Sequence, residues 1–206
     1  MKRLAATTVA AVSASLATAV GAGLDISPVN AAGSKSLVGT FKLDPGRYSG
    51  GKARGSYLRM VQPDGKPFPN PDSSARDRTY TLIRPGSDGG LVTGRTQRAP
   101  KPAFDRRGNA LARRIMRPQA FTAIDFSAFT TSSPRIRLSG KRLSGDLRGF
   151  TAAWNKQNFS QGSSRVSGSY NSRTRRYVLT WRSKVRGGPF NGFTGTWHLE
   201  GTFRSR

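Results

Sequence analysis

The end of the chain alternates between hydrophobic and polar positions with a period of two. From Phe193 to Phe203 the odd positions are apolar or glycine, whereas threonine, histidine and glutamate occupy the even ones. This period is that of a β-strand with one buried and one exposed face. We therefore predict a long final strand that places Trp197 in the core and His198 on the surface. The apolar run 177–185 predicts its hairpin partner, joined to it through a Gly-Gly-Pro turn.

Shorter runs of the same kind predict strands along most of the chain. They cover residues 33–43, 55–61, 79–84, 91–94, 111–116, 121–129 and 135–138. Proline and glycine turns separate them, and a proline-punctuated segment that is long for a simple connection runs from 62 to 78. Many short strands between turns favour an antiparallel sandwich or barrel, and the glycines that precede aromatic residues suit strongly curved strands.

One segment has the spacing of a helix instead. Leu147, Phe150 and Trp154 recur at intervals of three and four residues, and Asp146 is suited to cap the first turn. We predict a helix over 147–157 that covers one end of the β core. The expected fold class is mainly β, a single antiparallel β-barrel or sandwich domain with one short helix.

The first 31 residues have the pattern of a Sec-type signal peptide. A basic start, Met1-Lys2-Arg3, precedes a weakly apolar stretch to residue 21, and Val29-Asn30-Ala31 fits a cleavage site. We expect cleavage there, which leaves one β-rich domain, 32–206, in a secreted protein. The alternative is a retained anchor, which two glycines and a high content of alanine, threonine and serine disfavour. No other stretch has the length of apolar sequence needed to cross a bilayer.

Charge is the property in which the chain departs most from an average protein. It has 35 Lys and Arg against 10 Asp and Glu, which gives a formal net charge of +25. A positive field of this size attracts polyanions, and salt screens it. A compositional explanation stands beside the functional one, because 26 of the 35 basic residues are arginine and GC-rich coding sequence favours arginine codons.

Several kinds of catalytic and metal site are nearly excluded by composition. Without cysteine there is no disulfide, no thiolate zinc site and no cysteine nucleophile. His198 is the only histidine, and no Gly-x-Ser-x-Gly sequence occurs. We therefore expect no cofactor, no metal, and a binding function rather than catalysis.

Basic residues interleaved with aromatic ones are the strongest functional signal that remains. The predicted anion-binding residues are Arg175, Arg176, Arg182, Lys184, Arg186 and His198. In the predicted hairpin, Arg182 and Lys184 lie beside Thr194, Thr196 and His198. Arginine binds phosphate and carboxylate groups through two parallel hydrogen bonds. A second basic cluster consists of Arg106, Arg107, Arg113, Arg114 and Arg117.

Several segments resemble a group of secreted actinobacterial proteins of unknown function. They are Gly55–Val61, Gly89–Gly94, Phe104–Asp105, Gly108–Ala112, Leu143–Leu147 and Gly188–Phe203, and the resemblance spans nearly all of the expected mature chain. It implies an exported single domain and no particular activity.

These observations predict a secreted, monomeric, non-enzymatic domain whose basic face associates with an anionic cell-envelope polymer or an acidic glycan. Specific binding to nucleic acid is not expected, because the chain has no RNA-binding signature and export separates it from such ligands. One alternative is a carboxylate-dependent, glycan-active hydrolase, for which Asp125 and Asp146 are the least turn-like candidates. Another is a carrier of an apolar ligand inside a β-barrel. His198 and Glu200 are open to two interpretations, an acid/base pair or two ordinary exposed strand residues.

Overall fold

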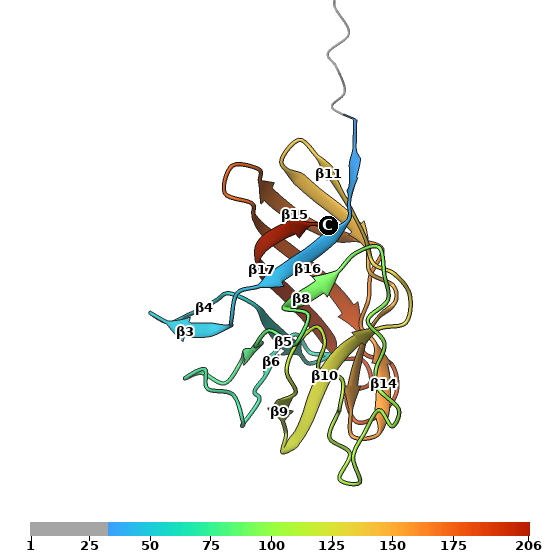
Figure 1. The fold of residues 1–206 in the computed structure, drawn as a ribbon. Coiled ribbons are helices and arrows are strands. Elements are labelled where there is room, and N and C mark those ends of the chain that lie inside the picture. The colour runs from blue at the N-terminus through green and yellow to red at the C-terminus, as the bar shows by residue number, and fades with distance from the viewer. Residues whose placement is uncertain (1–32) are drawn as a thin grey trace, which may run out of the picture. The chain divides into compact units, whose positions relative to one another are not determined.

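The computed structural model describes residues 33–206, and this part of the chain contains β-strands and no helix (Figure 1). In chain order the strands are β1 (Lys35–Leu37), β2 (Gly39–Leu43), β3 (Arg47–Ser49), β4 (Lys52–Arg54), β5 (Tyr57–Val61), β6 (Pro67–Phe68), β7 (Thr81–Leu82), β8 (Gly90–Val92), β9 (Gln119–Phe121), β10 (Ile124–Thr130), β11 (Arg135–Ser139), β12 (Arg142–Asp146), β13 (Phe150–Trp154), β14 (Gln157–Ser160), β15 (Val166–Asn171), β16 (Arg176–Lys184) and β17 (Thr194–Ser205). The predicted mainly β, antiparallel fold is confirmed. The predicted signal peptide lies outside the described residues.

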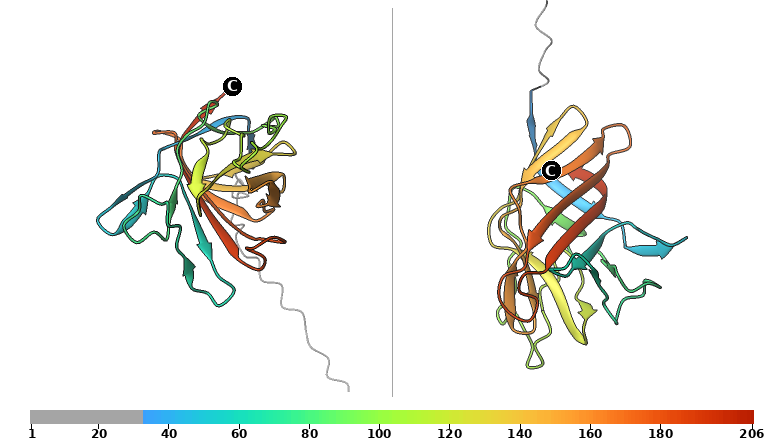
Figure 2. Two further views of the ribbon diagram at one scale, coloured as in Figure 1. Left: turned by 90° about the horizontal axis from the view of Figure 1, so that it is seen from below. Right: turned by 180° about the vertical axis from the view of Figure 1, so that it is seen from behind.

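The largest sheet has eleven strands and curls strongly into a half-barrel (Figure 2). Its main path runs β1-β11-β12-β15-β16-β17-β2-β8, with every neighbouring pair antiparallel. The long strand β17 is at the centre. It pairs with β16 on one side, and on the other side with β5 along its first half and β2 along its second half.

The predicted final hairpin is confirmed. Trp181 of β16 lies directly opposite Trp197 of β17, and their rings stack with centroids 5.8 Å apart and planes 7° apart. Along β17 the odd residues are buried and the even ones are partly exposed, up to Phe203. The alternation in the sequence therefore sets which face of the half-barrel is filled with apolar side chains.

Gln161 is a polar residue in the middle of this aromatic core. Its backbone oxygen accepts a hydrogen bond from Trp181 Nε1 at 2.7 Å, and its side-chain Oε1 accepts bonds from Trp197 Nε1 and Ser183 Oγ. A Cβ atom on Gly195 would lie 2.4 Å from the same Oε1. A side chain at position 195 would therefore crowd the amide that accepts the hydrogen bond of Trp197 Nε1.

A second sheet of four antiparallel strands, in the order β14-β13-β10-β9, packs on this core. Phe150 contacts both Trp181 and Trp197 edge-on, at centroid distances of 5.2 and 4.9 Å. On its other side the sheet is covered by the loop before β9, where Ala153 packs with Ala110 and Ala112. The central strands β10 and β13 of this sheet are thus covered on both faces.

The predicted helix over 147–157 is wrong, because β13 and β14 occupy this segment. All five residues of β13 are buried, since both faces of its sheet are covered, and such a strand shows no alternation. Asp146 does not cap a helix. It ends β12, and its carboxylate accepts hydrogen bonds from the backbone and side chain of Arg148.

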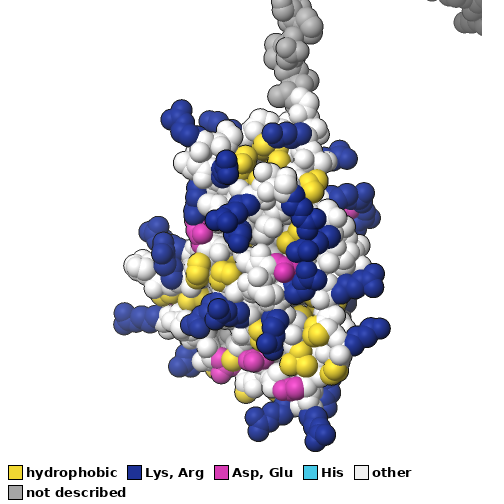
Figure 3. Space-filling model, viewed as in Figure 1, with side chains coloured by type: hydrophobic (Ala, Val, Ile, Leu, Met, Phe, Trp, Pro, Cys, Tyr) yellow, Lys and Arg dark blue, Asp and Glu magenta, His cyan; other side chains and the backbone are white. Residues whose placement is uncertain are grey.

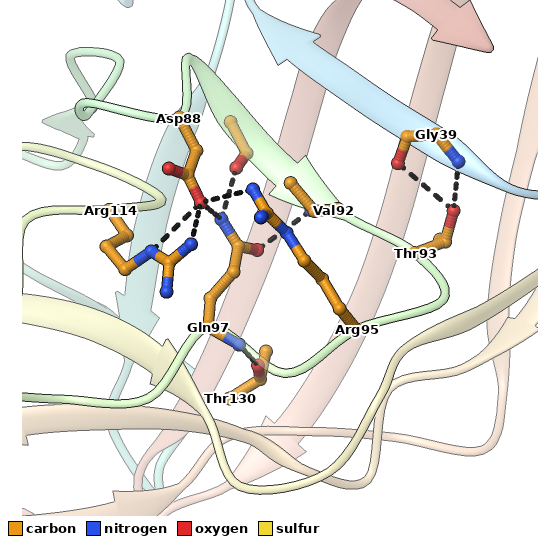
Figure 4. A network of polar contacts seen from close by, with 9 residues as sticks. Gly39, Asp88, Val92, Thr93, Arg95, Gln97, Arg114 and Thr130 are labelled. Carbon is orange, nitrogen blue, oxygen red and sulfur yellow. Dashed lines mark hydrogen bonds and ion pairs between the residues drawn. The ribbon is translucent and has the colours of Figure 1, made fainter. Parts of the chain in front are cut away.

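A buried polar network fixes the segment that follows β8 (Figure 4). The amide of Gln97 accepts a hydrogen bond from Val92 N at 2.8 Å and donates to Gly90 O and Asp88 Oδ2, each at 2.9 Å. Its backbone N donates to Thr130 Oγ1 at 2.6 Å. Gln97 therefore ties the edge of the half-barrel to the four-stranded sheet.

The proline-punctuated segment 62–78 is tied to the fold by Asn70. The side chain of Asn70 is buried and donates to Thr81 Oγ1 and to Ala120 O, both at 3.1 Å. The hairpin of β3 and β4, by contrast, projects away from the rest of the fold (Figure 1).

Candidate anion-binding surface

The outer face of the half-barrel carries the even residues of β16 and β17. Arg182 faces Thr196, and Lys184 faces Thr194, in direct cross-strand register. Both basic side chains are exposed. The register confirms the prediction that Arg182 and Lys184 lie beside these threonines.

Strand β5 adds a further arginine to this face. Arg59 lies opposite Thr196 on the side away from Arg182, so Thr196 stands between two arginines. Adjacent strands are about 4.8 Å apart, which places the two arginine Cα atoms about 10 Å from each other. Among residues 33–206, neither arginine forms an ion pair with a carboxylate. The register therefore places a basic residue on each side of Thr196.

Arg59 is held in place by an aromatic ring. Its guanidinium carbon lies 5.7 Å from the centroid of the Tyr80 ring, and Tyr80 contacts Tyr57 edge-on at 5.1 Å. Its Nε atom is buried and has no hydrogen-bond partner within the described chain. Contact with the ring restricts the side chain, and partial burial strengthens the attraction of its charge for an anion.

His198 occupies the next position along β17. Its ring stacks on Tyr57, with centroids 4.6 Å apart and planes 6° apart, and its Nε2 lies 3.6 Å from Glu200 Oε2. Burial lowers the pKa of His198, and the neighbouring Glu200 opposes this shift only in part. The imidazole is therefore mainly neutral at pH 7 and contributes shape and hydrogen bonding rather than charge.

A row of hydroxyl groups continues from His198 across the outer face. The residues in direct register are Thr180 on β16, Ser167 on β15, Ser144 on β12 and Arg137 on β11. We define the outer polar surface as His198 and these four side chains, together with Arg59, Arg182, Lys184, Thr194 and Thr196. It crosses six strands, so it is about 20 Å wide or more.

The predicted residues Arg175 and Arg176 lie at the opposite end of β16 from Arg182 and Lys184. Arg176 donates to Asp44 Oδ2 at 2.6 Å and to Glu200 Oε1 at 2.7 Å, and these carboxylates raise its pKa, chiefly through the bond to Asp44. Its charge is thus neutralised. Six residues of strand, about 20 Å, separate it from Arg182. Arg175 is exposed at the same far end of β16 and lines a different hollow with Lys35.

Arg186 follows the end of β16 and is exposed, in the loop that joins it to β17. The structure therefore brings together Arg182, Lys184 and His198 and places Arg186 just beyond them. Arg175 and Arg176 lie about 20 Å along β16 from Arg182, although Arg176 and His198 both contact Glu200.

The second predicted basic cluster is also divided. Arg114 lies 3.0 Å from Asp88, a carboxylate it shares with Arg95 in the network of Figure 4. Arg106, Arg107, Arg113 and Arg117 are exposed. Arg114 is thus engaged in an ion pair within the fold, whereas the other four arginines of the cluster are exposed.

Unpaired positive charge is abundant over the described residues. Of their 33 lysines and arginines, six take part in the ion pairs with Asp or Glu found there. Figure 3 shows one face of the molecule, on which lysine and arginine side chains are spread widely and few acidic ones lie between them. An anionic ligand therefore meets a positive field before it meets the outer polar surface.

The two carboxylates suggested for a hydrolase, Asp125 and Asp146, lie in different surroundings. Asp146 binds Arg148 and Arg135, and the hydrogen bond from Arg148 lowers the pKa of Asp146 to about 2. Asp125 borders a separate polar hollow with Arg113 and Arg117. Asp146 does not line this hollow.

Sequence reasoning did not find Arg59, Tyr57 and Tyr80 as members of the surface. Residues 55–61 were predicted as a strand, and their alternation places Tyr57 and Arg59 on one face. The missing information was that β5 pairs with β17, which joins residues about 140 positions apart. This register is set by the folded sheet and has no local signal.

Within residues 33–206 no group of three or more His, Cys, Asp and Glu side chains is arranged to hold a metal ion. The same residues contain no helix long and apolar enough to span a membrane. Comparison of the chain with protein-family models, with curated proteins and with solved structures finds no match.

Proposed function

We propose that the protein is an exported, non-enzymatic, monomeric binding domain that associates with an anionic polymer of the cell envelope or with an acidic glycan through the outer polar surface. The observation that supports this proposal most directly is the row Arg182, Thr196 and Arg59, in which two arginines without carboxylate partners flank a hydroxyl. Guanidinium groups in this arrangement suit phosphate, sulfate or carboxylate groups.

The hydroxyl row favours a ligand that is extended and carries hydroxyl groups of its own. Ser144, Ser167 and Thr180 provide donors and acceptors between His198 at one end of the row and Arg137 at the other. A polymer of anionic groups and polyols matches both kinds of contact. The surface is an open face of a sheet rather than a cleft, which suits binding to a chain better than enclosure of a small substrate.

The test is retention of the mature domain on immobilised polyphosphate and on heparin, with a neutral dextran resin as a blank. We expect binding at low salt that weakens steeply as salt rises. A triple variant, Arg59→Gln, Arg182→Gln and Lys184→Gln, should bind about tenfold or more weakly at low salt, which corresponds to about 1.4 kcal/mol.

A matched control removes the same charge elsewhere. Arg98, Arg106 and Arg107 are exposed and form no ion pair among the described residues, so their triple change to Gln lowers the net charge equally. This control should retain most of the affinity. Equal losses in the two triple variants would show that diffuse charge, and not the outer polar surface, binds the polymer.

A further inference from the structure

An apolar cavity lies between the half-barrel and the four-stranded sheet, on the inner side of the fold. Its volume is about 50 Å³, and most of its lining is aromatic. The rings that border it belong to Phe121, Phe126, Trp154, Phe159, Phe190 and Trp197. Gln161 is the only polar side chain in the lining, and its Oε1 already accepts the hydrogen bonds of Trp197 and Ser183.

The polar groups in the cavity lining already have hydrogen-bond partners and are not free to bind a water molecule. Trp154 Nε1 donates to Phe121 O at 2.8 Å, so this indole group also has its partner. Apolar cavities without free polar groups stay dry and bind apolar molecules by dispersion and ring contacts. The walls therefore select a neutral, apolar occupant.

Phe190 is the residue of the cavity lining that is partly exposed to solvent. Its ring lies 5.1 Å from Trp154, 5.4 Å from Phe121 and 5.5 Å from Phe68, between centroids, with the planes strongly inclined. The chain itself thus places an aromatic ring against these walls, in the edge-on geometry that aromatic groups prefer.

The loop that carries Phe190 holds itself together by its own hydrogen bonds. Gly192 N donates to Val185 O at 3.0 Å, Phe193 N to Phe190 O at 3.0 Å, and Gly187 N to Asn191 Oδ1 at 2.9 Å. Gly187, Gly188 and Gly192 have φ values of 78°, 63° and 84°, a region open to glycine at little cost. The bond between Gly187 and Asn191 lies within residues 186–192 and is kept if this segment moves as a unit, whereas the other two bonds join the segment to Val185 and Phe193.

We propose that this cavity is the binding site of one small, neutral ring compound, aromatic or alicyclic, which takes the place of the Phe190 ring as the loop 186–192 moves outward. The present volume is about one third of the roughly 150 Å³ apolar cavity known to accept benzene, so the ring must leave for a ligand to enter. This function is separate from polymer binding on the outer face, and either one stands without the other.

The test uses toluene as a neutral probe and the three indole N–H signals of the protein in NMR spectra. Trp154 and Trp197 border the cavity, whereas Trp181 does not, so its signal should shift less. We expect saturable shifts of the first two signals in the wild-type protein. In Phe190→Ala no ring has to be displaced, so this variant should bind toluene at least about tenfold more tightly.

Ala152→Leu fills the cavity from its lining and should abolish the shifts, with an intact fold shown by the Trp181 signal. Ala152→Val fills it less and should weaken binding to an intermediate degree, which keeps the test valid if leucine disturbs the fold. The triple variant of the outer polar surface should bind toluene like the wild type. An absence of saturable shifts in the wild type, or equal shifts in Ala152→Leu, would overturn the proposal.

Discussion

At the scale of single residues, Gln161 accepts hydrogen bonds from two buried tryptophans of the aromatic core. Replacing it with leucine leaves Trp197 Nε1 without its acceptor inside the core. A buried donor without a partner costs about 1–3 kcal/mol, so Gln161→Leu should lower the free energy of unfolding by about 2 kcal/mol or more. Urea denaturation measures this. Gln157→Leu is the control, because Gln157 is exposed and its change should stay within about 0.5 kcal/mol.

A second residue-scale prediction concerns pH. Because the pKa of His198 is lower in the folded protein than the ordinary value of 6.5, the unfolded chain takes up a proton first as the pH falls. Stability from the neutral imidazole is thus complete above pH 6.5 and declines below it, until the folded protein is protonated as well.

The free energy of unfolding should therefore decrease as the pH falls from 7 towards the lowered pKa of His198. His198→Phe keeps a ring against Tyr57 but does not titrate, so its stability should change less over the same pH range. His198 is the only histidine, which makes this comparison clean. A variant with the same pH dependence as the wild type would show that other groups cause it.

At the scale of elements, the sequence was informative where neighbours in space are also neighbours in the chain. The hairpin of β16 and β17 was predictable, because alternation and a short glycine-containing loop are local features. The pairing of β5 with β17 was not, because no local pattern encodes a register between distant segments. For this reason Arg182, Lys184 and His198 were found from the sequence, whereas Arg59 was not.

In the segment 147–157, by contrast, a local pattern led to a wrong prediction of a helix. Its apolar residues recur at helical intervals only because both faces of β13 are buried. The turn that follows it, Asn155-Lys156, has positive φ at both residues, 47° and 60°. That conformation is typical of the two-residue turn of a β-hairpin, which Asn-Gly signals more clearly than Asn-Lys.

This turn gives a prediction at the element scale. Glycine adopts positive φ without the steric cost that Lys156 bears, so Lys156→Gly should raise the free energy of unfolding by about 0.5–1 kcal/mol. Lys156→Ala removes the same charge but retains the Cβ, and should give no comparable gain. A gain of equal size in both variants would assign the effect to charge. Urea denaturation again provides the measurement.

At the scale of the whole molecule, positive charge and folding oppose each other. Most of the 33 basic side chains of the described part have no carboxylate partner there, so repulsion among them favours expansion of the chain. Salt shortens the range of this repulsion, with a Debye length that falls from about 30 Å at 0.01 M to about 10 Å at 0.1 M. The urea midpoint of the mature domain should therefore rise as NaCl is increased over this range.

The triple change of Arg98, Arg106 and Arg107 to glutamine tests the cause of this effect. By removing three exposed positive charges, it should raise the midpoint at 0.01 M NaCl and reduce its dependence on salt. If instead the wild type loses stability as salt is added, the ion pairs of Arg176 with Asp44 and Glu200 outweigh the repulsion. A midpoint that rises with salt would mean that the net positive charge of the chain weakens its fold.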